Sequence, residues 1–273
     1  NVVPHRWPGL KVQIFHGLGE EKPGHYRITG FFDLYCTPGP LVTQRFEARR
    51  RRKRHFLVRE TGWPKLDSLA ESIDIREAKS GLGLDPNRPL ILYAPTFSPR
   101  YESASALLEP ICSQAGSKYQ WIVKFHDLMP ANIRNSYQQR LGSAVLSAEH
   151  SDITPLLAAA DVMITDTSSV AYEFLMLDRP IITYRAAARQ DKGIDLQSPA
   201  NLAEAIQRSL DDPAEFTLQR QEYLGQLHPY RDGQSARRVV QACEGIIANG
   251  EHLRLRRKPL NLWRRYQNRN LVR

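Results

Sequence analysis

Short apolar runs alternate with segments of helical periodicity along most of this chain. Apolar, partly β-branched runs bounded by turn residues indicate buried strands, whereas apolar residues recurring every three to four positions indicate helices. From residue 90 onward this pattern predicts strands at 90–97, 120–126, 144–146, 162–165 and 180–184, and helices at 104–115, 129–141, 153–160, from 170, at 200–210, 213–227 and 233–249. Such regular alternation predicts an α/β fold with a parallel sheet wrapped by helices.

The amino-terminal part carries a less regular version of the same pattern. Strands are predicted at 12–15, 31–36 and 56–58, a helix at 41–54, and a helix followed by a turn over 67–84. The first strand runs into His16-Gly17-Leu18-Gly19, a glycine-rich loop whose backbone can approach a ligand closely. A neutral imidazole at His16 would be able to accept a proton from an incoming hydroxyl.

The stretch from Leu156 to Ile182 is the most informative part of the chain. A buried strand at 162–165 leads into Asp166-Thr-Ser-Ser169, and a helix follows from Val170. Free backbone N–H groups and the helix dipole favour an anion at such a turn, and hydroxyl side chains add donors for a phosphate. An ordinary Ser/Thr helix cap without a ligand is the alternative interpretation.

Further polar residues follow the other predicted strands. Pro95 and Thr96 end one strand, and Lys124-Phe-His126 ends the next. The carboxyl ends of parallel strands meet at one edge of a sheet, where ligands bind. Lys124 and His126 have the same-face spacing of a strand and together suit a phosphate group, although a single His at a strand end is more often structural.

Several classes of site are unsupported by the sequence. It contains no P-loop, no GxGxxG fingerprint and no GxSxG elbow, and no His, Cys, Asp or Glu residues at metal-ligand spacing. We therefore predict no dedicated metal site and no cofactor. The three cysteines form no CxxC pair, which suits a reducing cytoplasm. The absence of an apolar run of about 18 residues predicts no membrane span.

The net charge of +9 is concentrated in two segments. Residues 45–59 contain eight Arg or Lys against one Glu, and residues 252–273 contain eight and no acidic residue. The rest of the chain is therefore acidic overall. Aromatic and aliphatic residues interleave with the cations of the tail, which favours an anionic membrane surface over nucleic acid as the partner.

Taken in order, these motifs resemble the CDP-glycerol glycerophosphotransferase family, whose members make teichoic-acid-type polyol phosphate polymers. The resemblance covers roughly residues 10–245 and is most specific around Ser168 and Ser169. It is carried by His16-Gly17, Thr61-Gly-Trp-Pro-Lys-x-Asp67, Leu92-Tyr-Ala-Pro-Thr96, Lys124-Phe-His126, Asp161-x-x-Ile-Thr-Asp-x-Ser-Ser-Val170 and Asp232-Gly-x-Ser235.

The resemblance implies a glycosyltransferase-B-like fold and a set of site residues. His16 would be the catalytic base, and His126, with Lys124, would contact the donor diphosphate. The remaining substrate-binding positions would be Gly17, Gly19, Lys65, Pro95, Thr96, Phe125, Ser168, Ser169 and Glu173. The sequence departs from the family pattern at Lys65, usually Arg, at Glu173, often Asp, and around His16, where Phe15 replaces a Trp and Leu18-Gly-Glu20 replaces Thr-Pro-Leu.

The resemblance also implies a domain organisation and a function. Residues 1–62 would be a remnant of an acceptor-side domain, giving a truncated first Rossmann-like domain; residues 63–250 would bind the nucleotide donor, and 251–273 would form a basic tail. The implied activity is transfer of glycerol phosphate, or a related polyol phosphate, from a CDP-activated donor to a lipid-linked or polymer hydroxyl acceptor, at the inner face of the cell membrane. A nucleotide-sugar glycosyltransferase or epimerase of the same fold and a non-catalytic donor-binding module remain alternatives.

Overall fold

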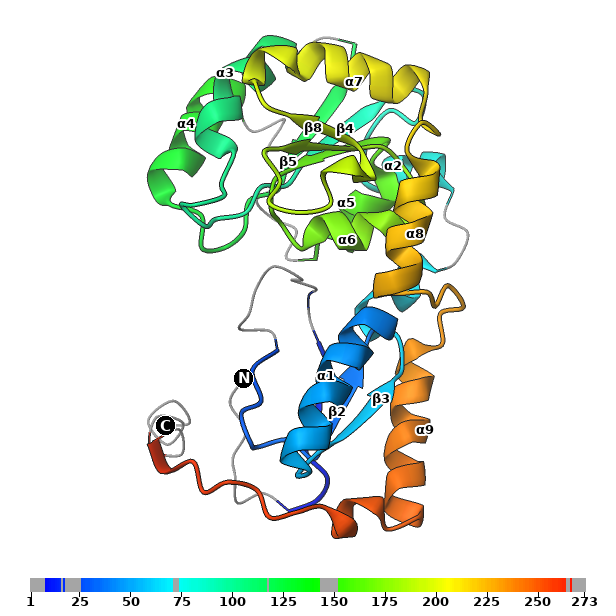
Figure 1. Cartoon of the computed structure of the whole chain (residues 1–273). Helices are drawn as coiled ribbons and strands as arrows, with labels where there is room; N and C mark the ends of the chain where they lie inside the picture. Colours follow the sequence, from blue (N-terminus) through cyan, green and yellow to red (C-terminus); the bar gives the residue numbers. More distant parts are fainter. Residues whose placement is uncertain are drawn as a thin grey trace. The chain divides into compact units, whose positions relative to one another are not determined.

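The chain forms two compact units, each built around its own parallel sheet (Figure 1). The first unit is drawn from residues 1–70 and 225–273, and the second from residues 71–224. The structure, a computed structural model, describes residues 8–15, 17, 26–70, 74–116, 118–142, 152–263 and 266. No helix in these ranges is long and apolar enough to cross a bilayer.

The first unit places one long helix on each face of a three-stranded parallel sheet with the order β1-β2-β3. Alternation along β2 explains this arrangement, because successive side chains of a strand point to opposite faces. Tyr35 packs against Phe46 of α1, whereas Leu34 and Cys36 pack against Ile246 of α9. The elements are β1 (Val12–Gln13), β2 (Leu34–Thr37), α1 (Pro40–Lys53), β3 (Leu57–Glu60), α9 (Ser235–Ala248) and 3-10 turns at Pro64–Leu69 and Glu251–Arg254.

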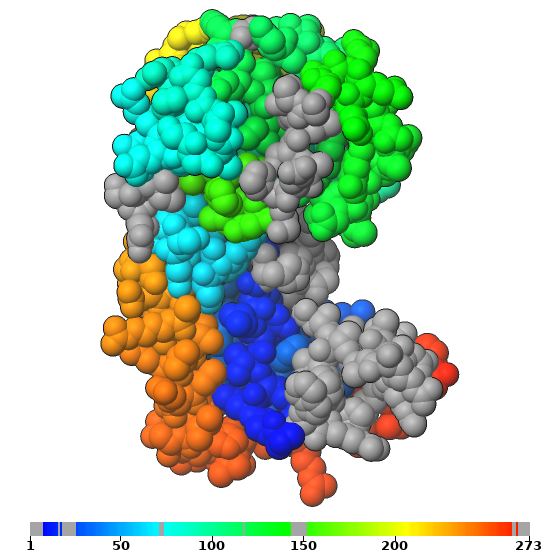
Figure 2. All heavy atoms as spheres, turned by 180° about the vertical axis from the view of Figure 1, so that it is seen from behind, coloured from blue at the N-terminus to red at the C-terminus, as the bar shows by residue number. Residues whose placement is uncertain are grey.

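Residues from the two ends of the chain are joined within the first unit. The Asp67 carboxylate accepts hydrogen bonds from the backbone N–H groups of Ser235 (3.0 Å) and Ala236 (2.8 Å), and so caps α9. Figure 2 shows α9, in orange, alongside blue and cyan residues from the amino-terminal part of the unit. Two of the motifs singled out in the sequence, around 61–67 and 232–235, therefore meet as a helix cap.

The second unit contains a five-stranded parallel sheet with the order β5-β4-β6-β7-β8. Its strands β4 and β6 are buried throughout, as expected for central strands covered on both faces. The elements are α2 (Ile75–Gly81), β4 (Leu90–Tyr93), α3 (Ala104–Gln114), β5 (Gln120–Val123), α4 (Ala131–Leu141), α5 (Thr154–Ala159), β6 (Val162–Thr165), α6 (Val170–Phe174), β7 (Ile181–Tyr184), β8 (Ile194–Leu196), α7 (Leu202–Asp211) and α8 (Thr217–Leu227).

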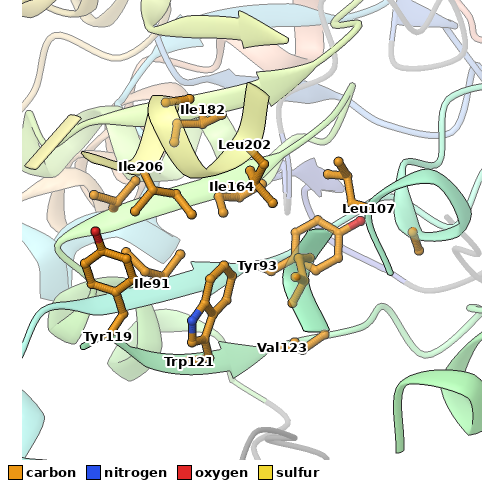
Figure 3. Packing of buried hydrophobic residues seen from close by; sticks show 14 of the residues in the cluster. Ile91, Tyr93, Leu107, Tyr119, Trp121, Val123, Ile164, Ile182, Leu202 and Ile206 are labelled. Carbon is orange, nitrogen blue, oxygen red and sulfur yellow. The ribbon is translucent and has the colours of Figure 1, made fainter. Parts of the chain in front are cut away.

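One large hydrophobic cluster fixes the sheet of the second unit against α3 and α7 (Figure 3). Tyr93 on β4 and Trp121 on β5 contribute its largest strand side chains, and Leu202 and Ile206 of α7 are fully buried in it. The burial of a side chain of this size contributes about 1.5–3 kcal/mol. The cluster therefore holds the strand ends, and the loops that follow them, in fixed positions.

The predicted elements agree with the structure except at a few places. The helix and turn predicted over 67–84 are present, but the helix is α2, which begins only at Ile75, and the described residues before it form the 3-10 turn ending at Leu69. Strand β8 was not predicted, and α8 begins at Thr217 rather than near residue 213. The strand predicted at 144–146 lies outside the described residues.

The segment after α9 packs onto the first unit as far as Asn261. Arg256 N–H donates to the carbonyl of Arg54 (3.0 Å), Lys258 pairs with Asp33 (2.5 Å), and Asn261 donates to the carbonyl of Thr29 (2.6 Å). The structure thus groups 225–261 with the amino-terminal residues, whereas the sequence suggested boundaries at 62 and 250. The functional assignment of those ranges stays a prediction.

Candidate functional site

The loops that follow β4, β5 and β6 meet at one edge of the five-stranded sheet. From β4 the chain moves to β5 on one side and returns to β6 on the other, so the topological switch point lies between β4 and β6. Ligands of open parallel sheets bind beyond the carboxyl ends of the strands at such a point. The structure therefore brings these predicted site residues to one edge: Pro95, Thr96, Lys124, Phe125, His126, Ser168 and Ser169.

Asp166 joins the two loops at the switch point. Its carboxylate accepts hydrogen bonds from the backbone N–H of Thr96 (2.9 Å) and from the N–H (3.0 Å) and hydroxyl (2.8 Å) of Ser103. The Ser103 hydroxyl is itself 2.8 Å from the hydroxyl of Tyr93. All of these groups are buried. Asp166 therefore fixes the loop after β4 and the start of α3 relative to the loop after β6.

Burial changes the acid–base behaviour of this carboxyl group. Removal from water raises the pKa of Asp166 to about 7, although the hydrogen bonds from Thr96 and Ser103 oppose the shift. Burial likewise raises the pKa of the Tyr93 phenol, which keeps it neutral as a hydrogen-bond donor. Asp166 was not among the site residues predicted from the sequence, although it starts the hydroxyl-rich turn and belongs to the motif of residues 161–170.

Asp166→Asn is expected to flatten the pH dependence of stability between about pH 4 and pH 7. In this window the folded chain holds a proton on Asp166 that the unfolded chain, with a pKa near 3.8, has released. The contribution of Asp166 to the free energy of unfolding is therefore complete below pH 4 and is lost as the pH rises through 7. A shift of this size corresponds to as much as about 4 kcal/mol.

Urea unfolding of the wild type and Asp166→Asn at several pH values measures this effect. Asp212→Asn, at an exposed position of the same unit, is the matched control for the substitution itself. An Asp166→Asn variant with an unchanged slope would show that this carboxyl does not titrate in the folded chain near neutral pH.

The loop after β5 is held rigidly and presents Lys124 and His126. Arg134 of α4 donates to the backbone carbonyls of His126 (3.2 Å) and Met129 (3.1 Å) and to that of Asp127. The Lys124 ammonium donates to the carbonyl of Phe125 (3.2 Å) and is half-buried. A cation is thus held beside the switch point.

The His126 ring is exposed and stacks obliquely on a neighbour from the next loop. Its centroid lies 4.4 Å from that of Phe97, which follows Thr96. Its Nδ1 accepts a hydrogen bond from the N–H of Leu128 (3.1 Å), so the neutral ring carries its proton on Nε2. A neutral His126 would therefore act through Nε2 as a donor toward a phosphate oxygen.

The double serine lies where the sequence predicted it, but its helix is short. Ser168 and Ser169 are half-buried and precede α6, five residues long and continued by the 3-10 turn Leu175–Leu177. The Ser169 side chain makes no capping hydrogen bond. The hydroxyl of Thr167, by contrast, accepts from the N–H of Ala187 (3.0 Å) and stabilises the loop after β7. Thr167 is thus structural, whereas the two serines stay candidates for ligand contact.

The other predicted positions are distributed differently. Glu173 is buried within α6. Gly17 is buried and Lys65 is exposed, and both belong to the first unit. His16 and Gly19 lie outside the described residues. Within the described ranges, no group of three or more His, Cys, Asp or Glu residues is placed to hold a metal ion.

The chain is similar to several known proteins. The family described as CDP-Glycerol:Poly(glycerophosphate) glycerophosphotransferase matches residues 20–245. A teichoic acid poly(glycerol phosphate) polymerase of Bacillus spizizenii is 30% identical over 164 residues, 56% of this chain and 41% of that protein. A teichoic acid glycerol-phosphate transferase of Staphylococcus aureus is 23% identical over 272 residues, 88% of this chain and 68% of that protein. The chain spans less than half the length of the Bacillus polymerase.

Among solved structures, a variant of the wall teichoic acid polymerase TagF soaked with CDPG matches with a TM-score of 0.68. The identity is 17%, and the match covers 92% of this chain and 72% of that one. This likeness confirms the predicted α/β fold of the glycosyltransferase-B kind, with parallel sheets wrapped by helices.

Proposed function

Because the chain belongs to the CDP-glycerol:poly(glycerophosphate) glycerophosphotransferase family, we propose that it transfers glycerol phosphate, or a related polyol phosphate, from a CDP-activated donor to a hydroxyl acceptor in cell-envelope polymer synthesis. The observation that carries this proposal is the convergence of three phosphate-suited loops at the switch point of the second unit. The matched TagF variant was soaked with CDPG, which supports CDP-glycerol as the donor.

Each loop has a proposed role toward the donor. Lys124 and His126 would contact the diphosphate, and Ser168 and Ser169 would donate hydrogen bonds to it from the opposite side of the switch point. Charge-assisted bonds of this kind shorten and strengthen as negative charge grows on the leaving group. Thr96, with Pro95, would line the nucleotide. Phe125, Glu173, Lys65, Gly17 and Gly19 stay proposed substrate-binding positions.

The proposed reaction is a direct displacement at phosphorus. The acceptor hydroxyl oxygen attacks the phosphorus that carries the glycerol group, and the bond from this phosphorus to the CMP oxygen breaks. His16, the proposed base, takes the hydroxyl proton, and CMP leaves with its phosphate charge offset by Lys124 and His126. Apart from this proton transfer, the step relies on positioning and electrostatic stabilisation, because phosphoryl transfer needs little covalent chemistry from the protein.

A panel of nucleotides tests donor recognition. Thermal unfolding in the presence of CDP-glycerol, CDP-ribitol, UDP-sugars and CMP is expected to show stabilisation by the CDP-polyols and by CMP, because binding to the folded state raises its stability by mass action. Stabilisation by UDP-sugars alone would instead favour a nucleotide-sugar enzyme of the same fold.

The proposed partners also include the membrane that holds a lipid-linked acceptor. Exposed apolar side chains lie in the basic carboxyl-terminal segment, among them Leu260 (66% exposed), Leu262 (68%) and Trp263 (70%). Apolar and cationic residues mixed in one exposed segment favour the interface of an anionic bilayer. We accordingly place the protein peripherally at the inner face of the cell membrane.

A further inference from the structure

A groove of about 440 Å³ lies in the first unit, at the end of its sheet where β3 begins. One wall is the last turn of α1 and the other is the segment that follows α9. The groove is lined by Arg50, Arg51, Arg54, Phe56, Leu57, Glu251, Arg254 and Leu255. Four guanidinium groups from two distant parts of the chain thus surround one cavity, whereas the proposed donor site lies in the other unit.

The acidic group in the groove is already neutralised. Glu251 accepts two hydrogen bonds from Nη2 of Arg59, at 2.8 and 2.6 Å. Arg50 pairs with Glu47 at 2.6 Å. Among the described residues, no ion pair is formed by Arg51, Arg54 or Arg254. These three cations therefore leave the groove with an excess of positive charge.

The groove is built into the fold rather than formed by a loose run of basic residues. Arg54 ends α1 in the left-handed region (φ 59°), and its N–H donates to the carbonyl of Arg50 (2.8 Å). Its own carbonyl accepts from the N–H of Arg256 (3.0 Å), which joins the two walls. Cations at a helix carboxyl terminus also interact favourably with the helix dipole. That effect does not account for Arg254, which comes from the opposite wall.

The apolar part of the groove indicates the kind of anion. Phe56, Leu57 and Leu255 provide a hydrocarbon surface beside the guanidinium groups. The segment that follows α9 continues along one border of the first unit (Figure 1). Two of its apolar side chains, Leu253 (78% exposed) and Trp263 (70%), face solvent. A soluble polyanion would leave these side chains in water, whereas a bilayer would bury them next to its headgroups.

We propose that this groove binds the phosphodiester headgroup of an anionic glycerophospholipid. Arginine suits this role because its planar guanidinium can donate two parallel hydrogen bonds to phosphate. Arg51, Arg54 and Arg254 hold the phosphate, and the exposed apolar side chains of 253–263 enter the interface beside it. This inference rests on the membrane partner proposed above and adds to it one discrete headgroup site.

Two triple variants with equal charge change test the groove. In the first, Arg51, Arg54 and Arg254 inside the groove become Gln. In the second, three neighbours outside the groove, Arg52, Lys53 and Arg257, also become Gln. Purely diffuse attraction to an anionic leaflet loses about fivefold in binding per cation removed, equally for both triples.

Binding is measured by co-sedimentation of the full chain with phosphatidylcholine vesicles that contain or lack phosphatidylglycerol. We expect the groove triple to bind about tenfold more weakly than the outside triple. Titration with soluble dihexanoyl-phosphatidylglycerol, below its micelle-forming concentration, is expected to saturate at one site in the outside triple and to be lost in the groove triple. Unchanged thermal unfolding of both variants verifies their folding.

Several results would overturn the proposal. Equal weakening of both triples would mean a diffuse basic surface without a headgroup site. Tighter binding of soluble poly(glycerol phosphate) or RNA than of phosphatidylglycerol vesicles, abolished by the groove triple, would assign the groove to that polymer. Donor binding, measured in parallel with CDP-glycerol on the wild type, tests the proposed function separately, since the donor site lies in the other unit.

Discussion

His16→Ala is expected to lower the rate of transfer by about 10²–10⁴-fold while changing donor affinity by no more than a few-fold. A general base acts on the proton of the acceptor hydroxyl, so its loss slows the chemical step and leaves the nucleotide contacts in place. The residue belongs to the glycine-rich stretch His16-Gly17-Leu18-Gly19 of the sequence, and its proposed role follows from the resemblance to the family. Rates of CMP release and calorimetric affinities for CDP-glycerol measure the two quantities.

His252→Ala provides a matched control in the first unit. The His252 ring lies 3.3 Å from the carbonyl of Ile246 and has no proposed role in transfer, so this variant is expected to keep the wild-type rate. A His16→Ala variant that loses donor affinity but keeps its turnover would make His16 a phosphate ligand, and the reaction would need another base.

Replacing both Ser168 and Ser169 by Ala is expected to weaken donor binding by at least about 100-fold. Each hydroxyl that donates to a charged phosphate contributes about 1.5–3 kcal/mol, and two such bonds together exceed the 2.7 kcal/mol that corresponds to 100-fold. The serines are half-buried at the switch point, and the Ser169 hydroxyl is not used to cap α6. Calorimetric titration with CDP-glycerol measures the loss.

The control for this variant is a second double replacement in the same unit. Ser113 and Ser136 donate only to carbonyls of their own helices, so Ser113→Ala with Ser136→Ala is expected to bind the donor as the wild type does. If the Ser168 and Ser169 double variant also kept full affinity, the loop after β6 would not contact the donor.

The strands that position the candidate site were predictable because their signal is local. Leu90–Tyr93 and Val162–Thr165 are continuous apolar runs, the pattern of central parallel strands, and both are fully buried. The carboxyl ends of parallel strands lie at the same edge of a sheet, and this rule alone predicted that Thr96 and Ser168, which follow these strands, lie at one edge. The order of the strands, and with it the switch point, came only from the structure.

The features that the sequence did not reveal depend on contacts between distant residues. Asp166 links two loops through Thr96 and Ser103, about 70 and 63 positions away, and no local pattern encodes that link. Asp67 was assigned to a helix, but its carboxylate is used to cap α9 through Ser235. The short strand β8 was missed because Asp195 interrupts its apolar run and instead accepts hydrogen bonds from the loop after β7.

The position of the carboxyl-terminal segment was likewise not predictable from the sequence. Its basic and aromatic composition suggested an appendage at the membrane, yet Lys258 and Asn261 fasten it to the first unit through Asp33 and the carbonyl of Thr29. Contacts of this kind between residues that are distant in sequence have no signature in composition. The groove beside Arg54 lies between the last turn of α1 and the segment that follows α9, so the sequence alone did not predict it.

Transfer from CDP-glycerol, measured on the purified chain with a hydroxyl acceptor of the polyol phosphate type, tests the central claim most directly. The account predicts that one CMP is released for each glycerol phosphate joined to the acceptor, and that UDP-sugars do not replace CDP-glycerol. Binding of CDP-glycerol without release of CMP would contradict the claim, because the chain would then be a donor-binding module rather than a transferase.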